Sequence, residues 1–400
     1  GSAHAELMNM ACKAAVVGRG VAHLVLPDEV QVQPSDAEPG GPLGRVASRQ
    51  VAPSAEVVAA AVDMIGGSTR PMIIVGYGAR NDMAAVRAFA EHIGAPVATT
   101  FKGKGAISDR HELGCGVLGR SGTPIASWFM NESDLLIVFG ASFSDHTGIA
   151  PYKPTIQVDL DPMALGRFHA VDLPMLGHAA VTARLLADEV GDDHGCVDHR
   201  SEVAERWSIW RAEKASRRAD RGDGVNAAAL FDSLSRIADP DAVLCVDVGN
   251  NTYSFGRYFE VADQSVLMSG YLGSIGFGFP AAMGAWAAVG DERQIIGVSG
   301  DAGFGQYAME VTTAVKYGMN ITHVIMNNSE LGKISKEQRA ARLEVWQTSI
   351  RNPSFGEFAQ LCGAWGARVG RADQLDAALT AALAHDGPAI VEEYGSTAVV

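Results

Sequence analysis

The chain has 400 residues, of which 47% are apolar, and it carries a formal net charge of -14. This length provides for at least two buried cores, because a single core seldom outgrows about 250–300 residues. The acidic balance, without a lysine or arginine cluster, disfavours nucleic acid and membrane surfaces as partners. Five scattered cysteines without C-x-x-C spacing indicate a reducing, cytoplasmic compartment and argue against a disulfide framework or a zinc site.

The first thirty residues predict one helix, Ala5 to Val17, and one strand, Val21 to Pro27. One helix and one strand cannot bury their apolar faces alone. We therefore expect residues 1–30 to be the end of a domain whose remainder is absent from this sequence. Residues 31–54 are rich in Pro, Gly, Ser and Asp, which is typical of a linker.

Residues 55–190 alternate between helix and strand patterns, which predicts an α/β domain with a doubly wound parallel sheet. The pattern opens with a helix, a strand from Arg70, a Gly76-Tyr77-Gly78 turn and a second helix, as in Rossmann-like domains. A lone Gly-x-Gly turn fits structural packing as well as nucleotide binding. Further strands are expected at residues 96–99, 134–139 and 155–160.

Residues 191–225 are charged and turn-rich and predict a second linker, after which residues 226–400 resume the αβ alternation of a second parallel-sheet domain. Its first strand leads to Gly249-Asn250-Asn251, where Asn250 suits either a phosphate contact or a helix cap. The uncharged span 266–290 is long enough to cross a membrane, but its glycines and Pro280 favour a buried strand, loop and helix.

The segment from Val298 to Gly332 carries the strongest functional signal. One apolar run leads to Gly300-Asp301-Ala302-Gly303 and a second leads to Asn327-Asn328, with a helix pattern between them. A right-handed crossover places both strand ends on one sheet edge, so Asp301 and Asn328 should lie side by side. Small residues before a helix suit a phosphate, and the two side-chain oxygens suit a hard cation such as Mg²⁺. A metal-bridged diphosphate is predicted; an ordinary αβ turn with a capping Asp is the alternative.

This turn, followed by Asn-Asn at a strand end, resembles the thiamine diphosphate (ThDP) motif of 2-oxo acid decarboxylases, acetolactate synthases and pyruvate oxidases, with Ala302 at a position where the family has glycine. The resemblance implies that Mg²⁺ is bound by Asp301, Asn328 and the backbone carbonyl of Glu330. Residues 269–282 resemble the family's pyrimidine-contacting loop, in which Ile275 takes the place of the bulky residue that holds the cofactor in a V shape. The implied cofactor contacts are Gly249, Asn250, Asn251, Gly273, Ser274, Ile275, Gly300, Asp301, Ala302, Gly303, Asn328, Leu331 and Gly332.

The resemblance continues outside this domain. One segment resembles the closing strand of the family's N-terminal pyrimidine-binding (PYR) domain; its sequence is G-R-G-V-A-H-L-V-L-P-D-E-V-Q. Residues 1–30 are therefore interpreted as a remnant of that domain. Residues 55–190 resemble the central domain of pyruvate oxidases and acetohydroxyacid synthases, which bind FAD there. If FAD binds, the expected positions are Gly76, Gly78, Lys102, Gly103, Asp159 and Asp161. A capped turn at a strand end explains the two aspartates equally well.

The resemblance implies ThDP- and Mg²⁺-dependent decarboxylation of a pyruvate-like 2-oxo acid, with the electrons passed to FAD as in pyruvate oxidases. An acetolactate synthase-like carboligase and a non-catalytic subunit that retains the fold are the alternatives. In the family the activating glutamate belongs to the PYR domain, and that glutamate is not in this sequence. We therefore expect another, PYR-containing chain to complete the site within a homo- or hetero-oligomer. His146, in S-D-H-T, is the most site-like histidine, although a structural histidine is the commoner case.

Overall fold

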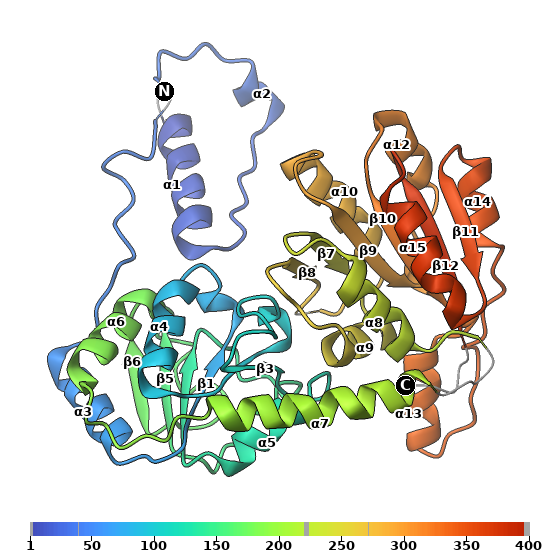
Figure 1. The fold of residues 1–400 in the computed structure, drawn as a ribbon. Helices are drawn as coiled ribbons and strands as arrows, with labels where there is room; N and C mark the ends of the chain where they lie inside the picture. Colours follow the sequence, from blue (N-terminus) through green and yellow to red (C-terminus); the bar gives the residue numbers. More distant parts are fainter. Residues whose placement is uncertain (1–2, 39, 220–223, 271, 396–400) are drawn as a thin grey trace. The chain divides into compact units, whose positions relative to one another are not determined.

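The computed structural model describes residues 3–38, 40–219, 224–270 and 272–395, which form two units divided after Val51. The first unit contains helices α1 (Ala3–Gly18) and α2 (Asp28–Gln31) (Figure 1). The helix predicted at residues 5–17 is confirmed, whereas the strand predicted at residues 21–27 is wrong. That segment is a loop in which Val21 is fully exposed. No described strand lies beside it, and an unpaired strand leaves its backbone N–H and C=O groups without partners.

The second unit begins with a sheet of six parallel strands in the order β3-β2-β1-β4-β5-β6, which confirms the doubly wound α/β prediction. Alternate strand residues face opposite sides: Ile73 packs toward α3, α4 and α6, whereas Ile74 packs toward α5 and α7. The bounds are α3 (Ala55–Gly66), β1 (Pro71–Val75), α4 (Met83–Ile93), β2 (Val97–Thr99), β3 (Gly114–Val117), α5 (Pro124–Glu132), β4 (Leu135–Phe139), β5 (Thr155–Asp159), β6 (Leu173–Leu176), α6 (Ala179–Val190) and α7 (Arg200–Arg218). Two short 3₁₀ turns, η1 (Tyr77–Ala79) and η2 (Phe101–Gly103), follow β1 and β2.

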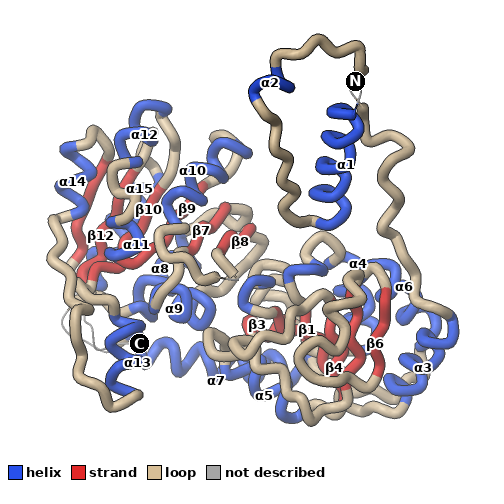
Figure 2. The backbone as a smooth tube through the Cα atoms, turned by 180° about the vertical axis from the view of Figure 1, so that it is seen from behind, coloured by secondary structure: helices blue, strands red, loops and turns tan. Residues whose placement is uncertain are grey.

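A second parallel sheet follows, in the order β11-β12-β10-β9-β7-β8, again with helices on both faces (Figure 2). Helices α8, α9 and α15 cover one face, and α10, α11, α12 and α14 cover the other. The bounds are α8 (Ala227–Ile237), β7 (Val243–Val246), α9 (Asn250–Tyr258), β8 (Ser265–Met268), α10 (Gly278–Val289), β9 (Ile295–Gly300), α11 (Asp301–Gly305), α12 (Glu310–Tyr317), β10 (Thr322–Asn327), α13 (Gly332–Ala340), α14 (Phe355–Leu361), β11 (Trp365–Val369), η3 (Ala372–Gln374), α15 (Leu375–Leu383) and β12 (Ala389–Tyr394). The strand, loop and helix predicted within residues 266–290 are β8, the loop after it and α10.

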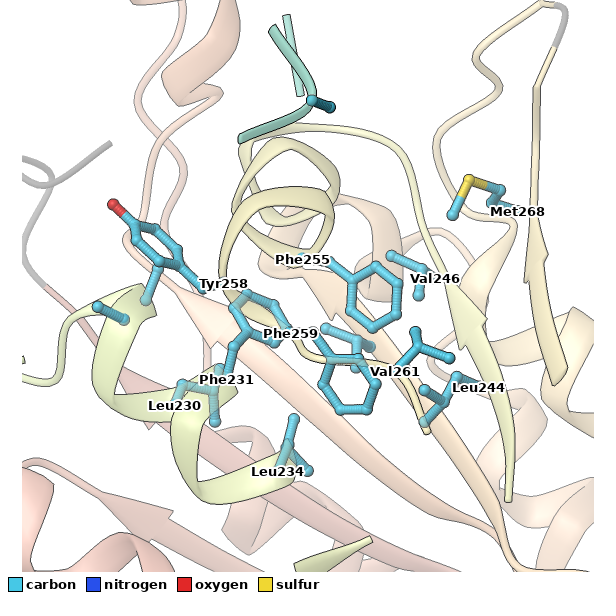
Figure 3. Packing of buried hydrophobic residues seen from close by; sticks show 14 of the residues in the cluster. Leu230, Phe231, Leu234, Leu244, Val246, Phe255, Tyr258, Phe259, Val261 and Met268 are labelled. Carbon is cyan, nitrogen blue, oxygen red and sulfur yellow. The ribbon is translucent and has the colours of Figure 1, made fainter. Parts of the chain in front are cut away.

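The core beneath α8 and α9 fixes the strand end that later forms part of the site. Phe231 of α8 meets Phe255 of α9 edge to face at 5.7 Å between ring centroids, and Phe255 stacks on Phe259 at 4.8 Å (Figure 3). Leu244 and Val246 of β7 belong to the same buried cluster. Because these rings are fully desolvated, truncating one would cost about 3–5 kcal/mol, so the first turn of α9 is firmly held.

The two sheets of the second unit are joined by buried contacts. Asp109, before β3, pairs with Lys104 at 3.0 Å, and both side chains are at most 4% exposed. The same carboxylate accepts the N–H of Val261, which lies between α9 and β8. The segment predicted as the second linker contains the long helix α7, whose Trp207 donates its indole N–H to the carbonyl of Gly114. Trp210 of this helix stacks on Tyr258, so α7 contributes to the shared core.

Within the described residues, no helix combines the length and the apolar character that a bilayer span requires.

Candidate active site

A cavity of about 260 Å³ opens at the carboxyl edge of the second sheet. It lies where β7 and β9 are neighbours, the point at which the strand order reverses, and ligands of open α/β sheets bind at such switch points. The cavity is lined by Val225, Asn226, Ala227, Val248, Gly249, Asn250, Asn251, Ser254, Gly273, Ile275, Gly300, Asp301, Ala302, Gly303, Met326, Asn327, Asn328, Glu330, Leu331, Gly332, Lys333, Ile334, Glu393 and Gly395. Of the residues predicted for ThDP and metal, only Ser274 is not in this lining.

Asp301 and Asn328 follow neighbouring strands, as the crossover predicted. Gly300 of β9 is in register with Met326 of β10, which places the two turns side by side. The Asp301 side chain accepts the N–H of Ala302 on Oδ1, and on Oδ2 it accepts the N–H of Ser329 at 2.7 Å. The second turn is therefore tied directly to the first.

The oxygens at this edge fit a hard divalent cation. Burial raises the pKa of Asp301, and a bound cation would offset that cost by favouring the charged carboxylate. Oδ1 of Asp301 and Oδ1 of Asn328 each accept a single N–H, so each retains a lone pair for a metal. In the described ranges, no three His, Cys, Asp or Glu side chains gather as a metal cluster. A cation here would thus rely on one carboxylate, one amide, the Glu330 carbonyl and ligand oxygens, a set that suits Mg²⁺.

The surrounding backbone fits an anionic group. Helix α9 begins at the cavity after Gly249, whose φ of 141° is accessible chiefly to glycine, and α13 begins there at Gly332. Both helices have nine residues and direct their first N–H groups toward the cavity edge, as at phosphate sites. Helix α11 has only five residues, so its dipole contributes less than the sequence suggested. Ala302 has ordinary helical backbone within α11, so its methyl group causes no strain.

The two asparagines at the start of α9 have different roles. Gly249 is the cap position, so Asn250 is the first helical residue and not the cap. The Asn250 amide nitrogen lies 2.8 Å from the position that a Cβ on Gly332 would take, so the two helix starts pack closely here. Asn251 instead donates its amide to the carbonyl of Asp247 at 2.9 Å and so stabilises the strand end.

Ile275 lies in the cavity wall with 37% of its surface exposed. Gly273 and Gly276 on either side have positive φ angles of 62° and 92°, so the loop bends sharply around it. The main-chain N–H of Ser274 donates to the hydroxyl of Ser269 and closes this bend.

Asp247, Asn352 and Glu393 are three polar side chains at the site that sequence reasoning missed. Asp247 is fully buried at the end of β7, and the signal was an acid placed in the otherwise apolar run before Gly249. Asn352 donates its amide to Oδ2 of Asp301 at 2.7 Å, and nothing in its sequence context indicates this. Glu393 lines the cavity from β12, and the signal was again an acid inside an apolar strand.

Glu393 is 2% exposed, and its Oε1 has no hydrogen-bond partner among the described residues. Burial raises the pKa of this carboxyl well above its usual range. Its contribution to stability is present at acidic pH and is lost as pH rises, because the unfolded chain releases this proton first. Glu393→Gln should therefore raise the free energy of unfolding at pH 8 by about 1 kcal/mol and make little difference at pH 4. Denaturant melts at both pH values test this, and equal effects at both would contradict it.

The residues predicted for FAD make contacts within the chain. A Cβ on Gly76 would lie 2.1 Å from the carbonyl oxygen of Gly140, and Gly78 packs against the same residue. A Cβ on Gly103 would lie 2.9 Å from the carbonyl oxygen of Val75. The Lys102 Nζ lies 4.5 Å from the centre of the Tyr77 ring.

The aspartates at the end of β5 hold a turn. Asp159 accepts the N–H of Asp161, and Asp161 accepts the N–H of Met163, both at 2.9 Å. Burial raises the pKa of Asp159. These hydrogen bonds give both aspartates a structural role in the turn. FAD binding at this strand end stays a prediction. His146 is exposed and does not line the cavity of the second sheet.

Comparison with known proteins agrees with this geometry. Residues 58–186 match the family described as "Thiamine pyrophosphate enzyme, central domain", and residues 247–393 match "Thiamine pyrophosphate enzyme, C-terminal TPP binding domain", pyrophosphate being another word for diphosphate. The chain is 32% identical over 390 residues to a Bacillus subtilis protein named as thiamine pyrophosphate-containing, YdaP, covering 97% of this chain and 67% of the relative.

Two further relatives are large subunits of acetolactate synthase. One, from Parasynechococcus marenigrum, is 30% identical over 91% of this chain and 60% of its own length. The other, isozyme 2 from Escherichia coli, is 29% identical over 96% of this chain and 69% of its own length. The chain thus spans 60–69% of the length of these curated relatives. The two matched domains, in this order, and the similarity along almost the whole chain establish that it belongs to the thiamine diphosphate-dependent enzyme family.

Proposed function

We propose that this chain supplies the diphosphate- and metal-binding part of an enzyme that decarboxylates a small 2-oxo acid such as pyruvate. The observation that carries the proposal is the cavity at the switch point, where Asp301, Asn328 and the first turn of α9 converge. When bound, ThDP supplies the electron sink that the loss of carbon dioxide requires. The chain's own residues bind the diphosphate through α9 and α13, hold Mg²⁺ through Asp301, Asn328 and the Glu330 carbonyl, and orient the rings against Ile275.

We further propose that a PYR domain of another chain covers the cavity and supplies the activating carboxylate. Apolar side chains near the cavity are exposed, among them Ile275 at 37%, Tyr307 at 45% and Ile334 at 44%. Large apolar side chains left exposed around a cavity support a partner that covers it. The oligomer, the reducing cytoplasmic location and the domain division at residues 1–30, 31–54, 55–190, 191–225 and 226–400 belong to the same proposal.

The intermediate left after decarboxylation can react in two ways, by oxidation or by addition to a second carbonyl compound. The sequence of the central domain favours oxidation of this intermediate by FAD, as in pyruvate oxidases. The relatives named acetolactate synthase favour its addition to a second carbonyl compound. A flavin absorption band that bleaches anaerobically with pyruvate would support oxidation. Formation of acetolactate or acetoin would support carboligation.

The test of the proposal begins with isothermal titration of the chain with ThDP in the presence of Mg²⁺, alone and with a PYR-containing chain. We expect saturable binding that requires Mg²⁺ and release of carbon dioxide from pyruvate once the PYR domain is present. Absence of ThDP binding under both conditions would contradict the proposed function. Full decarboxylase activity of the isolated chain would contradict the requirement for a second chain.

A further inference from the structure

Asp247 joins three of the segments that surround the cavity. It follows β7 and is fully buried. On Oδ1 its carboxylate accepts three backbone N–H groups, from Val248 at 2.7 Å, Gly276 at 3.0 Å and Phe277 at 3.1 Å. Two of these donors belong to the loop that carries Ile275. A carboxylate that receives several N–H groups is a rigid anchor, because each bond is charge-assisted.

The same carboxylate also touches the diphosphate turn. Oδ2 lies 2.3 Å from the position that a Cβ on Gly303 would occupy, so the turn after Asp301 packs directly against it. The backbone carbonyl of Asp247 accepts the side chains of Asn251 and Thr252, which fixes the start of α9. The pyrimidine loop, the Gly300–Gly303 turn and the first turn of α9 therefore meet at one residue.

The loop that carries Ile275 needs such an anchor. It contains Gly270, Gly273 and Gly276, and glycine loses more conformational freedom on ordering than any other residue. Apart from the Ser274–Ser269 contact, Asp247 is the one side chain among the described residues that accepts hydrogen bonds from the N–H groups of residues 272–277. Without the carboxylate, the amides of Gly276 and Phe277 would lose their side-chain acceptor, and the loop would lose the hydrogen bonds that order it.

We propose that Asp247 is a positioning residue that fixes Ile275 relative to the diphosphate turn, so that the ring-bearing and diphosphate ends of one cofactor are held together. This inference rests on the proposed function, because it assigns the two ends to ThDP. Asp247 itself touches neither end: its carboxylate acts through the loop and through Gly303. The hydrogen bonds that hold Asp301 and the first turn of α9 do not involve its side chain.

The test compares two probes, Mg²⁺-ThDP and Mg²⁺-pyrophosphate, which lacks the rings. In Asp247→Ala the affinity for pyrophosphate should stay within about twofold of wild type, while the preference for ThDP over pyrophosphate should fall about tenfold. Asp247→Asn, which keeps one acceptor oxygen at the position of Oδ1, should restore most of that preference. If the alanine variant does not fold, Asp247→Ser, with a single shorter acceptor, should show a smaller loss in the same direction.

Asp134→Ala provides the matched control. Its carboxylate likewise accepts backbone N–H groups, from Thr69 and Arg70, but it precedes β4 in the other sheet. This variant should lose stability and keep the ThDP preference of wild type. A fall in melting temperature without any change in that preference for Asp247→Ala would show a purely structural role and overturn the proposal.

Hydrogen exchange without ligand provides a second, independent measurement. Peptides covering residues 272–277 should exchange faster in Asp247→Ala, while peptides of β9 and β10 should keep their protection. Unchanged exchange in that loop would overturn the proposal. If wild type binds neither probe, the proposed function fails, and the exchange result still decides whether Asp247 holds the loop.

Discussion

Replacing Asp301 with alanine is expected to weaken Mg²⁺-ThDP binding by about 100-fold or more. Loss of a residue that merely supports a metal ligand typically costs 10–100-fold in metal affinity, and Asp301 is the carboxylate of the proposed ligand set. Its removal also releases the N–H of Ser329 and the amide of Asn352, which hold the second turn beside the first. Isothermal titration measures the affinity, and a thermal melt of the ligand-free protein separates lost binding from lost folding.

Two variants sharpen this experiment. Asp301→Asn keeps the shape and an acceptor but not the charge, so it should fold like wild type and still bind Mg²⁺-ThDP poorly. Asp159→Ala removes another part-buried aspartate at a strand end, in the other sheet, and should leave the affinity unchanged. Wild-type affinity in both Asp301 variants would refute the metal assignment.

Acid should destabilise this protein through one buried histidine. His323 of β10 is fully buried between Phe279 and Phe304, and its Nε2 contacts the Ser299 hydroxyl at 2.7 Å. Desolvation lowers the pKa of His323 to about 3, so the ring stays neutral in the folded state while it gains a proton in the unfolded chain. The contribution of His323 to the free energy of unfolding should therefore fall by about 1.4 kcal/mol per pH unit below pH 6.5, down to about pH 3.

Denaturant melts between pH 7 and pH 4 check this slope against variants. His323→Phe keeps a flat ring over Gly297, where a Cβ would meet the imidazole, and removes the titrating group, so its acid slope should be shallower than that of wild type. His146→Gln, at an exposed position, should keep the wild-type slope. Parallel slopes in wild type and His323→Phe would exclude the histidine as the cause.

The sequence was most informative where an apolar strand run leads directly into a motif of known spacing. The apolar runs before Gly300 and Asn327 predicted two neighbouring parallel strands, and their register brings Asp301 to Ser329. Strands β3 and β6 were not foreseen, because a four-residue strand containing two glycines, or one containing proline, shows no periodic signal. Helix α7 was underestimated because its polar residues outnumber the apolar ones, among them the two tryptophans, that bury it.

The missing parts of the site share a physical reason. Asn352 reaches Asp301 across 51 positions of sequence, and Glu393 enters the cavity because β12 pairs with β10. Contacts of this kind depend on strand order, which local patterns do not encode. At residues 21–27 the local pattern was misleading, because a β-rich run forms a strand only when a neighbour pairs with it.

The ion pair of Lys104 and Asp109, with its bond to the amide of Val261, limits how this protein can be recombined with its relatives. Domains that shuffle freely meet through polar, hydrated surfaces. Here a graft of the first sheet domain alone would keep the Lys104–Asp109 pair but remove the Val261 N–H that its carboxylate accepts. A graft of the second sheet domain alone would leave that buried amide without an acceptor. Residues 104–109 and the turn at Val261 therefore pack as one unit, and a chimera that preserves these contacts must exchange both together.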